Sequence, residues 1–161
     1  MSTEMARRLA EACKCSEEAK DLYIKTPYQD KEVEQIYLAR WRELAEQEAP
    51  ANASACESSK DAMDFYHKAM EGSKAKAVYG ALWVRLANRE APNKARLCKS
   101  YEDAERLYQD APVESEAQVV YLTRMLELKV AVLQESRGRF KTLSLVKADS
   151  GVARNLGHKR N

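Results

Sequence analysis

Apolar and aromatic residues recur along this chain at the spacing of a helical face. Tyr37, Trp41 and Leu44 stand four and three residues apart, and Tyr79 and Tyr121 each open a segment with the same spacing. Residues spaced in this way lie on one side of an α-helix. The pattern predicts helices near residues 3–13, 16–26, 31–48, 57–71, 74–89, 99–110 and 114–135. Whether the first two form one continuous helix is left open.

These segments belong to three copies of one pattern about 42 residues long. The sequences AKDLY, AMDFY and AERLY begin at residues 19, 62 and 104, and YLARWREL, YGALWVRL and YLTRMLEL begin at 37, 79 and 121. Cys13, Cys56 and Cys98 each precede the tyrosine of the first block by ten residues. A helical unit of this kind buries its apolar face against its neighbours. The sequence therefore predicts an all-α fold of three stacked helical hairpins with about seven helices.

The repeat divides the chain into a helical-repeat domain and a tail. We predict the repeat domain over residues 1–136, with units at about 5–47, 48–89 and 90–131, and an extended tail over residues 137–161. Pro50 and Pro92 follow the second helix of a unit. Proline has no N–H donor, so each is predicted to end the helix before it.

The charges are distributed unevenly between these two parts. Residues 1–136 carry 20 Lys and Arg against 24 Asp and Glu, whereas the tail has a single acid, Asp149. The basic residues of the tail are Arg137, Arg139, Lys141, Lys147, Arg154, Lys159 and Arg160. Such a tail favours an acidic partner surface. No apolar run approaches the roughly 20 residues that a membrane-spanning helix needs.

The sequence shows no residues with the spacing of a catalytic, cofactor-binding or metal site. Cys13 and Cys15 form a C-x-C pair, but no second pair or nearby histidine completes four ligands for a metal ion. His67 stands where the other copies have Ile24 and Gln109, so we expect it on the surface and not as a base. The glycines stand singly, without a Gly-rich phosphate loop. The sequence predicts a protein that is not an enzyme and uses no cofactor.

The second block of one copy, followed by the first block of the next, resembles a pentatricopeptide repeat. The two pairs are 37–41 with 62–66 and 79–83 with 104–108, and the unit is longer than the usual repeat of that family. The resemblance implies helical hairpins and, for most of the family, RNA binding in an organelle. That family reads a base through a polar residue just after the helix-opening tyrosine, but here Leu38, Gly80 and Leu122 stand there. With the net negative charge of residues 1–136, these side chains make sequence-specific RNA binding unexpected.

In size, repeat class and basic tail the chain also resembles the small accessory subunits that euglenozoan protists attach to the outer surface of the F1 head of their mitochondrial ATP synthase. That resemblance implies a non-catalytic structural subunit in the mitochondrial matrix, peripheral to the inner membrane through the complex, with the ATP synthase α-subunit as partner. Two alternatives remain. One is an organellar RNA-binding pentatricopeptide protein, and the other is a peptide-binding adaptor similar to tetratricopeptide proteins.

The last predicted helix carries two apolar stripes. Tyr121, Met125, Leu128 and Val132 continue the core face of the other copies, and Leu122, Leu126, Val130 and Leu133 form a second stripe. Either residues 140–146 fold back and cap this second stripe, or it binds a partner while the basic tail extends over an acidic surface. The candidate partner-binding residues are Leu122, Leu126, Val130, Leu133, Arg137, Arg139, Lys141, Lys147 and Arg154.

Overall fold

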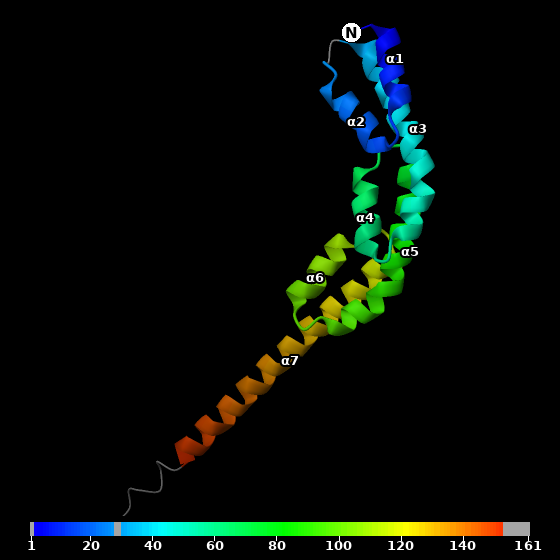
Figure 1. Cartoon of the computed structure of the whole chain (residues 1–161). Coiled ribbons are helices and arrows are strands. Elements are labelled where there is room, and N and C mark those ends of the chain that lie inside the picture. Colours follow the sequence, from blue (N-terminus) through cyan, green and yellow to red (C-terminus); the bar gives the residue numbers. More distant parts are fainter. Residues whose placement is uncertain (1, 28–29, 153–161) are drawn as a thin grey trace, which may run out of the picture. The chain divides into compact units, whose positions relative to one another are not determined.

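The computed structural model of the chain describes residues 2–27 and 30–152, with side chains up to residue 137. Over these residues it forms seven α-helices and no strands, which confirms the predicted all-α class (Figure 1). The helices are α1 (Thr3–Ala12), α2 (Ser16–Lys25), α3 (Lys31–Ala55), α4 (Ser59–Lys68), α5 (Lys74–Leu97), α6 (Tyr101–Asp110) and α7 (Glu116–Val152). Backbone contacts divide the chain into two compact units, Met1–Glu90 and Ala91–Asn161, with the division inside α5.

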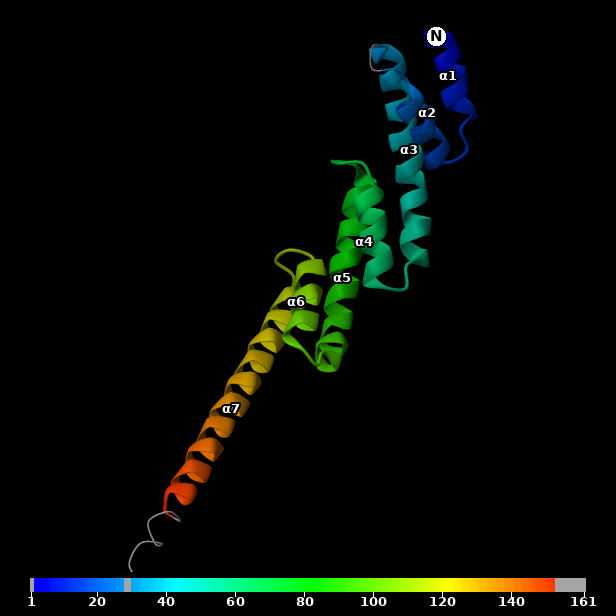
Figure 2. The same ribbon diagram turned by 90° about the vertical axis from the view of Figure 1, so that its left-hand side faces the viewer.

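In the first unit, α1 and α2 both lie beside α3 (Figures 1 and 2). Ala6 and Ala10 of α1 form one buried cluster with Val33 and Tyr37 of α3. The cap residue Cys13 has extended backbone geometry, and it separates α1 from α2. These residues therefore form two helices.

The second half of α3 packs with α4 and the start of α5. Ala49 shares a buried cluster with Ala75 and Tyr79, against which Phe65 and Tyr66 of α4 pack. A neighbouring cluster joins α4 and α5 through other residues of the same copy: Ala62, Leu82 and Leu86. The first unit therefore has a continuous set of apolar contacts over α1 to α5.

In the second unit α6 lies along α7 (Figure 2). Its core contains Cys98, Ala104 and Met125, with Tyr108 and Leu128 packed against them. Ala104 and Leu128 are the third-copy counterparts of Ala62 and Leu86, which are buried in the first unit, and Met125 takes the place of the partly buried Trp83. The local sequence pattern therefore gives the same packing in both units.

Alanine occupies equivalent, fully buried positions in the three copies. Ala19, Ala62 and Ala104 are each 0% exposed, and Ala6, Ala49 and Ala91 are 0%, 1% and 0% exposed. A side chain that ends at Cβ lets the axes of two helices come close together. Because the second set lies in α1, in the second half of α3 and in α5, each long helix belongs to two copies of the repeat.

This sharing explains why the prolines do not end their helices. Pro50 lies inside α3 and Pro92 inside α5, so the predicted ends at residues 48 and 89 are wrong. An interior proline costs about 3 kcal/mol through the lost hydrogen bond and the ring clash. Both rings lie on exposed positions next to the buried Ala49 and Ala91. Packing of the alanines beside each proline, Ala49 and Ala53 in α3 and Ala91 and Ala95 in α5, offsets the local cost.

The predicted end of the last helix at residue 135 is also wrong, because α7 continues to Val152. The extended conformation expected after residue 136 therefore does not apply to residues 137–152, and residues 140–146 continue the helix instead of folding back on it. A single Gly138 lowers helix propensity by about 1 kcal/mol, and strong helix formers such as Arg137 and Arg139 flank it. The side chains beyond residue 137 lie outside the described part of the structure.

The turns before α5 and α7 use one backbone geometry. Gly72 has a φ of 70° and Glu114, its counterpart in the next copy, has a φ of 59°. Glycine adopts this left-handed region freely, whereas a residue with a Cβ is strained there. The third copy therefore keeps the turn of the second with a less suitable residue.

Candidate functional site

The helix-opening tyrosines of the repeat are core residues. Tyr37, Tyr79 and Tyr121 are at most 4% exposed, which confirms their predicted structural role. The ring of Tyr79 stacks on that of Phe65 with centroids 5.1 Å apart, and Asn52 donates a hydrogen bond to its hydroxyl at 3.2 Å. Both the ring and the hydroxyl of this tyrosine make contacts within the protein.

The two tryptophans are partly buried and pack against core clusters between the helices. Trp41 lies against Tyr23 with ring centroids 5.7 Å apart, and Trp83 lies against Tyr66 at 5.4 Å. Each tryptophan covers the tyrosine of the short helix in its copy and keeps one edge in solvent. In the middle copy the Tyr66 ring also lies 3.2 Å from the place of a Cβ on Gly80. Gly80 thus makes room for a ring of α4.

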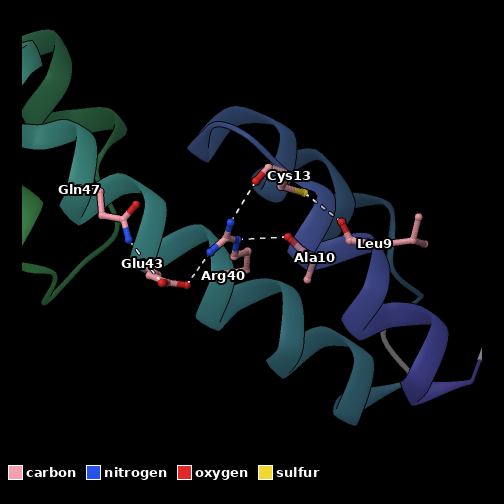
Figure 3. A network of polar contacts seen from close by, with 6 residues as sticks. All are labelled: Leu9, Ala10, Cys13, Arg40, Glu43 and Gln47. Carbon is pink, nitrogen blue, oxygen red and sulfur yellow. Dashed lines mark hydrogen bonds and ion pairs between the residues drawn. The ribbon is translucent and has the colours of Figure 1, made fainter.

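Arginines satisfy backbone carbonyls at helix ends in two copies. Arg40 donates from Nε to the Ala10 oxygen and from Nη2 to the Cys13 oxygen, both at 3.1 Å, and its Nη1 lies 2.8 Å from Glu43 (Figure 3). Arg124 contacts the Cys98 oxygen at 2.9 Å in the same way. The last carbonyls of a helix have no partner within it, and these guanidinium groups supply one. We assign these arginines a structural role.

A glutamate of each long helix holds the start of the preceding short helix in the first two copies. Glu48 accepts hydrogen bonds from Ser16 N at 2.8 Å and Ser16 Oγ at 2.6 Å, and Glu90 accepts the same pair from Ser59. At the matching places the third copy has Tyr101 and Val132. The third copy has therefore lost both members of this polar contact.

The valine at the place of this glutamate, Val132, differs from its prediction. We expected this valine on the core face of the last helix, but it is 62% exposed. Its position is the one at which Glu48 and Glu90 contact a serine at the rim of the core. Helical spacing alone does not separate a rim position from a core position.

The cysteines behave as packing residues. The thiols of Cys13, Cys56 and Cys98 each donate to the carbonyl oxygen four residues earlier, at 3.3–3.4 Å. Burial raises the pKa of all three thiols, which keeps them protonated at neutral pH. Within residues 2–27 and 30–137 no group of three or more His, Cys, Asp and Glu residues is placed to hold a metal ion. His67 is exposed, as predicted.

The second stripe of α7 is an exposed apolar face. Its members lie three and four residues apart, which places them on one side of the helix. The exposed fractions are Leu122 44%, Leu126 57%, Val130 50% and Leu133 57%, and Val119, at 65%, extends the stripe by one turn. We did not predict Val119, although its spacing from Leu122 could have shown it. Among the described side chains, these five form the candidate docking face, called the α7 stripe below.

The basic members of the predicted site are only partly described. Arg137 is exposed and follows Leu133 by one turn, so it lies at the C-terminal end of the α7 stripe. Arg139, Lys141 and Lys147 belong to α7, but their side chains lie outside the described residues, as does all of Arg154. Of the predicted basic residues, Arg137 is therefore the one whose side chain is described beside the four predicted apolar residues.

A second feature is a hollow of about 270 Å³ in the first unit, lined by residues of α2, α3, α4 and α5. Its walls include Trp41, Phe65 and the buried Tyr79. Its charged lining residues are Lys20, Lys68, Glu17 and Glu48, of which Glu48 is bonded to Ser16. Lys20 lies 5.9 Å from the centroid of the Trp41 ring. A hollow with aromatic walls and lysines suits an apolar or aromatic group joined to a carboxylate.

Comparison with protein-family models, with curated proteins and with solved structures found no match. None of the described helices is long and apolar enough to cross a membrane. The candidate function therefore rests on the geometry of the chain itself.

Proposed function

We propose that this protein is a non-catalytic accessory subunit of a larger complex, and that it binds its partner through the α7 stripe. The observation that carries this proposal is the exposed row of five large aliphatic side chains on a single helix. Removing such a surface from water is favourable by about 25 cal/mol per Å². A continuous exposed apolar face is typical of a binding surface, whereas single exposed leucines are not.

The rest of the described chain supports a structural role. The arginines and glutamates that could have served as charged binding groups, Arg40, Arg124, Glu48 and Glu90, are engaged with backbone or serine groups of the chain itself. The thiols are held protonated by burial. These side chains stabilise the helix ends, which is a structural use of their charge.

The specific complex we propose is the mitochondrial ATP synthase, with the chain on the outer surface of the F1 head, in the matrix, and with the α-subunit as partner. Support for it comes from the size, the pentatricopeptide-like repeat and the basic C-terminal segment. A subunit of this kind contributes to the assembly or stability of the head and takes no part in the chemistry.

The test is a gentle purification of the protein from its source at physiological salt, followed by identification of what migrates with it. We expect the chain in a large assembly that contains ATP synthase subunits and that persists at 300 mM salt. RNA as the ligand would instead appear as nuclease-sensitive binding that weakens by orders of magnitude from about 50 to 200 mM salt. Recovery of a free monomer would refute the proposal.

The hollow of the first unit favours one other candidate function, an adaptor that binds an acidic peptide. Under that function Lys68→Glu should abolish binding of a peptide partner, since Lys68 lines the hollow and is exposed. Lys99→Glu is the matched control, because Lys99 is exposed and is neither a lining residue of the hollow nor a member of the α7 stripe. Equal partner binding by the two variants would exclude the adaptor function.

A further inference from the structure

We infer that the partner surface of the α7 stripe is an amphipathic helix with large aliphatic side chains and acidic residues beside them. This inference rests on the proposed function and specifies the chemistry of the partner. It is drawn from a comparison of α7 with the matching segments of α3 and α5, together with the charges that border the stripe.

The shape of the stripe matches a helix. Successive members of the α7 stripe are separated by three, four, four and three residues. This spacing is the one with which two helices interlock their side chains along a common seam. The opposite side of α7 already packs in its own unit, where Met125 is buried in a cluster with Cys98 and Ala104. Over residues 119–133 the helix is therefore held on one side and open on the other.

The size of the side chains excludes another unit of the same repeat as the occupant. Ala49 in α3 is 1% exposed and packs in a buried cluster with Ala75 and Tyr79, so the space beside its Cβ is filled by α4 and α5. By the 42-residue offset, Leu133 corresponds to Ala91 and, one copy further back, to Ala49.

Arg137 likewise takes the place of Ala95 and Ala53. A repeat hairpin that packs against Ala49 and Ala53 would overlap a leucine and an arginine at these places. Large aliphatic side chains instead fit between large aliphatic side chains of a helix at the usual separation of about 8–10 Å. The occupant is therefore a helix with leucine-sized residues, placed further from α7 than a repeat unit would be.

The charges bordering the stripe determine the second property of the partner. Lys129 and Arg137 are exposed on α7 at the C-terminal half of the stripe. The sequence from residue 137 onward has seven basic residues and one acid. A second copy of the chain packed in parallel would bring two basic segments together, whereas an acidic partner helix would be attracted to this one. The observations therefore favour a different protein over a second copy.

The test uses the full-length chain in the complex recovered from its source. A photoreactive p-benzoylphenylalanine replaces Leu126, and a second preparation carries it at Val113, which is 81% exposed and lies before α7. We expect the Leu126 probe to cross-link one peptide of a different protein, with leucine, isoleucine or valine at helical spacing and Asp or Glu beside them. We expect no such product from Val113. A cross-link to a second copy of the chain, to RNA, or to a peptide without these features would overturn the inference.

Two substitutions test how much this surface contributes to partner binding. Leu126→Gln should reduce retention of the partner about 30-fold, as for a central residue of an interface, while Val113→Gln leaves it unchanged. Arg137→Glu should reduce it about 5- to 10-fold, with the loss shrinking as salt is raised, and Lys99→Glu should have no effect. The Leu126→Gln chain should keep its melting temperature, since the side chain is exposed in the described structure.

The results separate this inference from the function on which it rests. If the complex forms with the wild-type chain and equally well with Leu126→Gln and Arg137→Glu, the accessory-subunit function stands and the helix-binding inference fails. If the wild-type chain is recovered alone, both fail.

Discussion

The second half of α3 and the matching segment of α7 are counterparts in the repeat, but their side chains differ in burial. In α3, Ala49 and Ala53 belong to a buried cluster, and Glu48 holds the start of α2 through Ser16. In α7 the same positions carry Leu133, Arg137 and Val132, of which the two aliphatic residues are 57% and 62% exposed. One helical pattern thus serves as an internal contact in one place and as an open surface in the other. The repeat specifies the helices, and the size of a few side chains decides what can cover them.

The largest difference between the two regions should appear when a buried tyrosine and a residue of the α7 stripe are each truncated. Tyr79→Ala should lower the free energy of unfolding by about 3–5 kcal/mol, because it removes a buried ring that stacks on Phe65. Leu126→Ala should change it by less than about 0.5 kcal/mol. Urea unfolding followed by circular dichroism measures both. A loss of more than about 2 kcal/mol for Leu126→Ala would mean that the stripe is packed within the chain.

Exchanging the two side chains at one repeat position tests the size argument. Ala49→Leu should destabilise the first unit by about 1–3 kcal/mol, since Ala49 is 1% exposed beside Ala75 and Tyr79 and three more carbon atoms would overpack this cluster. Leu133→Ala should have almost no effect on stability and should weaken partner binding. Thermal unfolding and partner retention are the two measurements. Equal stability of Ala49→Leu and the wild type would contradict the close packing that excludes a further repeat unit.

Loss of the polar contact that only the first two copies retain should have an effect of comparable size. Glu90→Ala removes the acceptor of two hydrogen bonds from Ser59, at 2.8 and 2.6 Å, and should cost about 1–3 kcal/mol. Val132→Ala, at the matching place in α7, is the control and should be neutral. If Glu90→Ala is as mild as Val132→Ala in the same denaturant titration, the glutamate contact contributes nothing to stability.

The smallest effect should come from the turn before α7. Glu114→Gly should stabilise the protein by about 1 kcal/mol, because the residue has a φ of 59° and glycine is unstrained there. Gly72→Glu, its converse in the preceding copy, should destabilise by a similar amount. The melting temperatures of the two variants show whether the first is stabilised and the second destabilised. A fall in melting temperature for Glu114→Gly would show that its greater freedom in the unfolded chain outweighs the relief of strain.

The spacing of apolar residues was sufficient for the helix class, the number of helices and the buried tyrosines, because one buried face per helix leaves a direct mark in the sequence. It was not sufficient for helix ends. Pro50, Pro92 and Gly138 are local signals for an ending, and each lies inside a helix that continues. At the prolines, burial of the neighbouring alanines Ala49 and Ala91 overrides the local preference.

Four of the five residues of the α7 stripe were also determined by the sequence alone, since their spacing on the same predicted helix sets them apart from the core face of Tyr121 and Met125. Only the tertiary structure decided that Val132 belongs to the exposed side. It also decided that Arg40, Glu48 and Glu90 are engaged in holding helix ends. Those outcomes depend on which residues from distant parts of the chain meet at the rim of the core. Such contacts join residues about 30 positions apart, and the periodicity of a single helix carries no record of them.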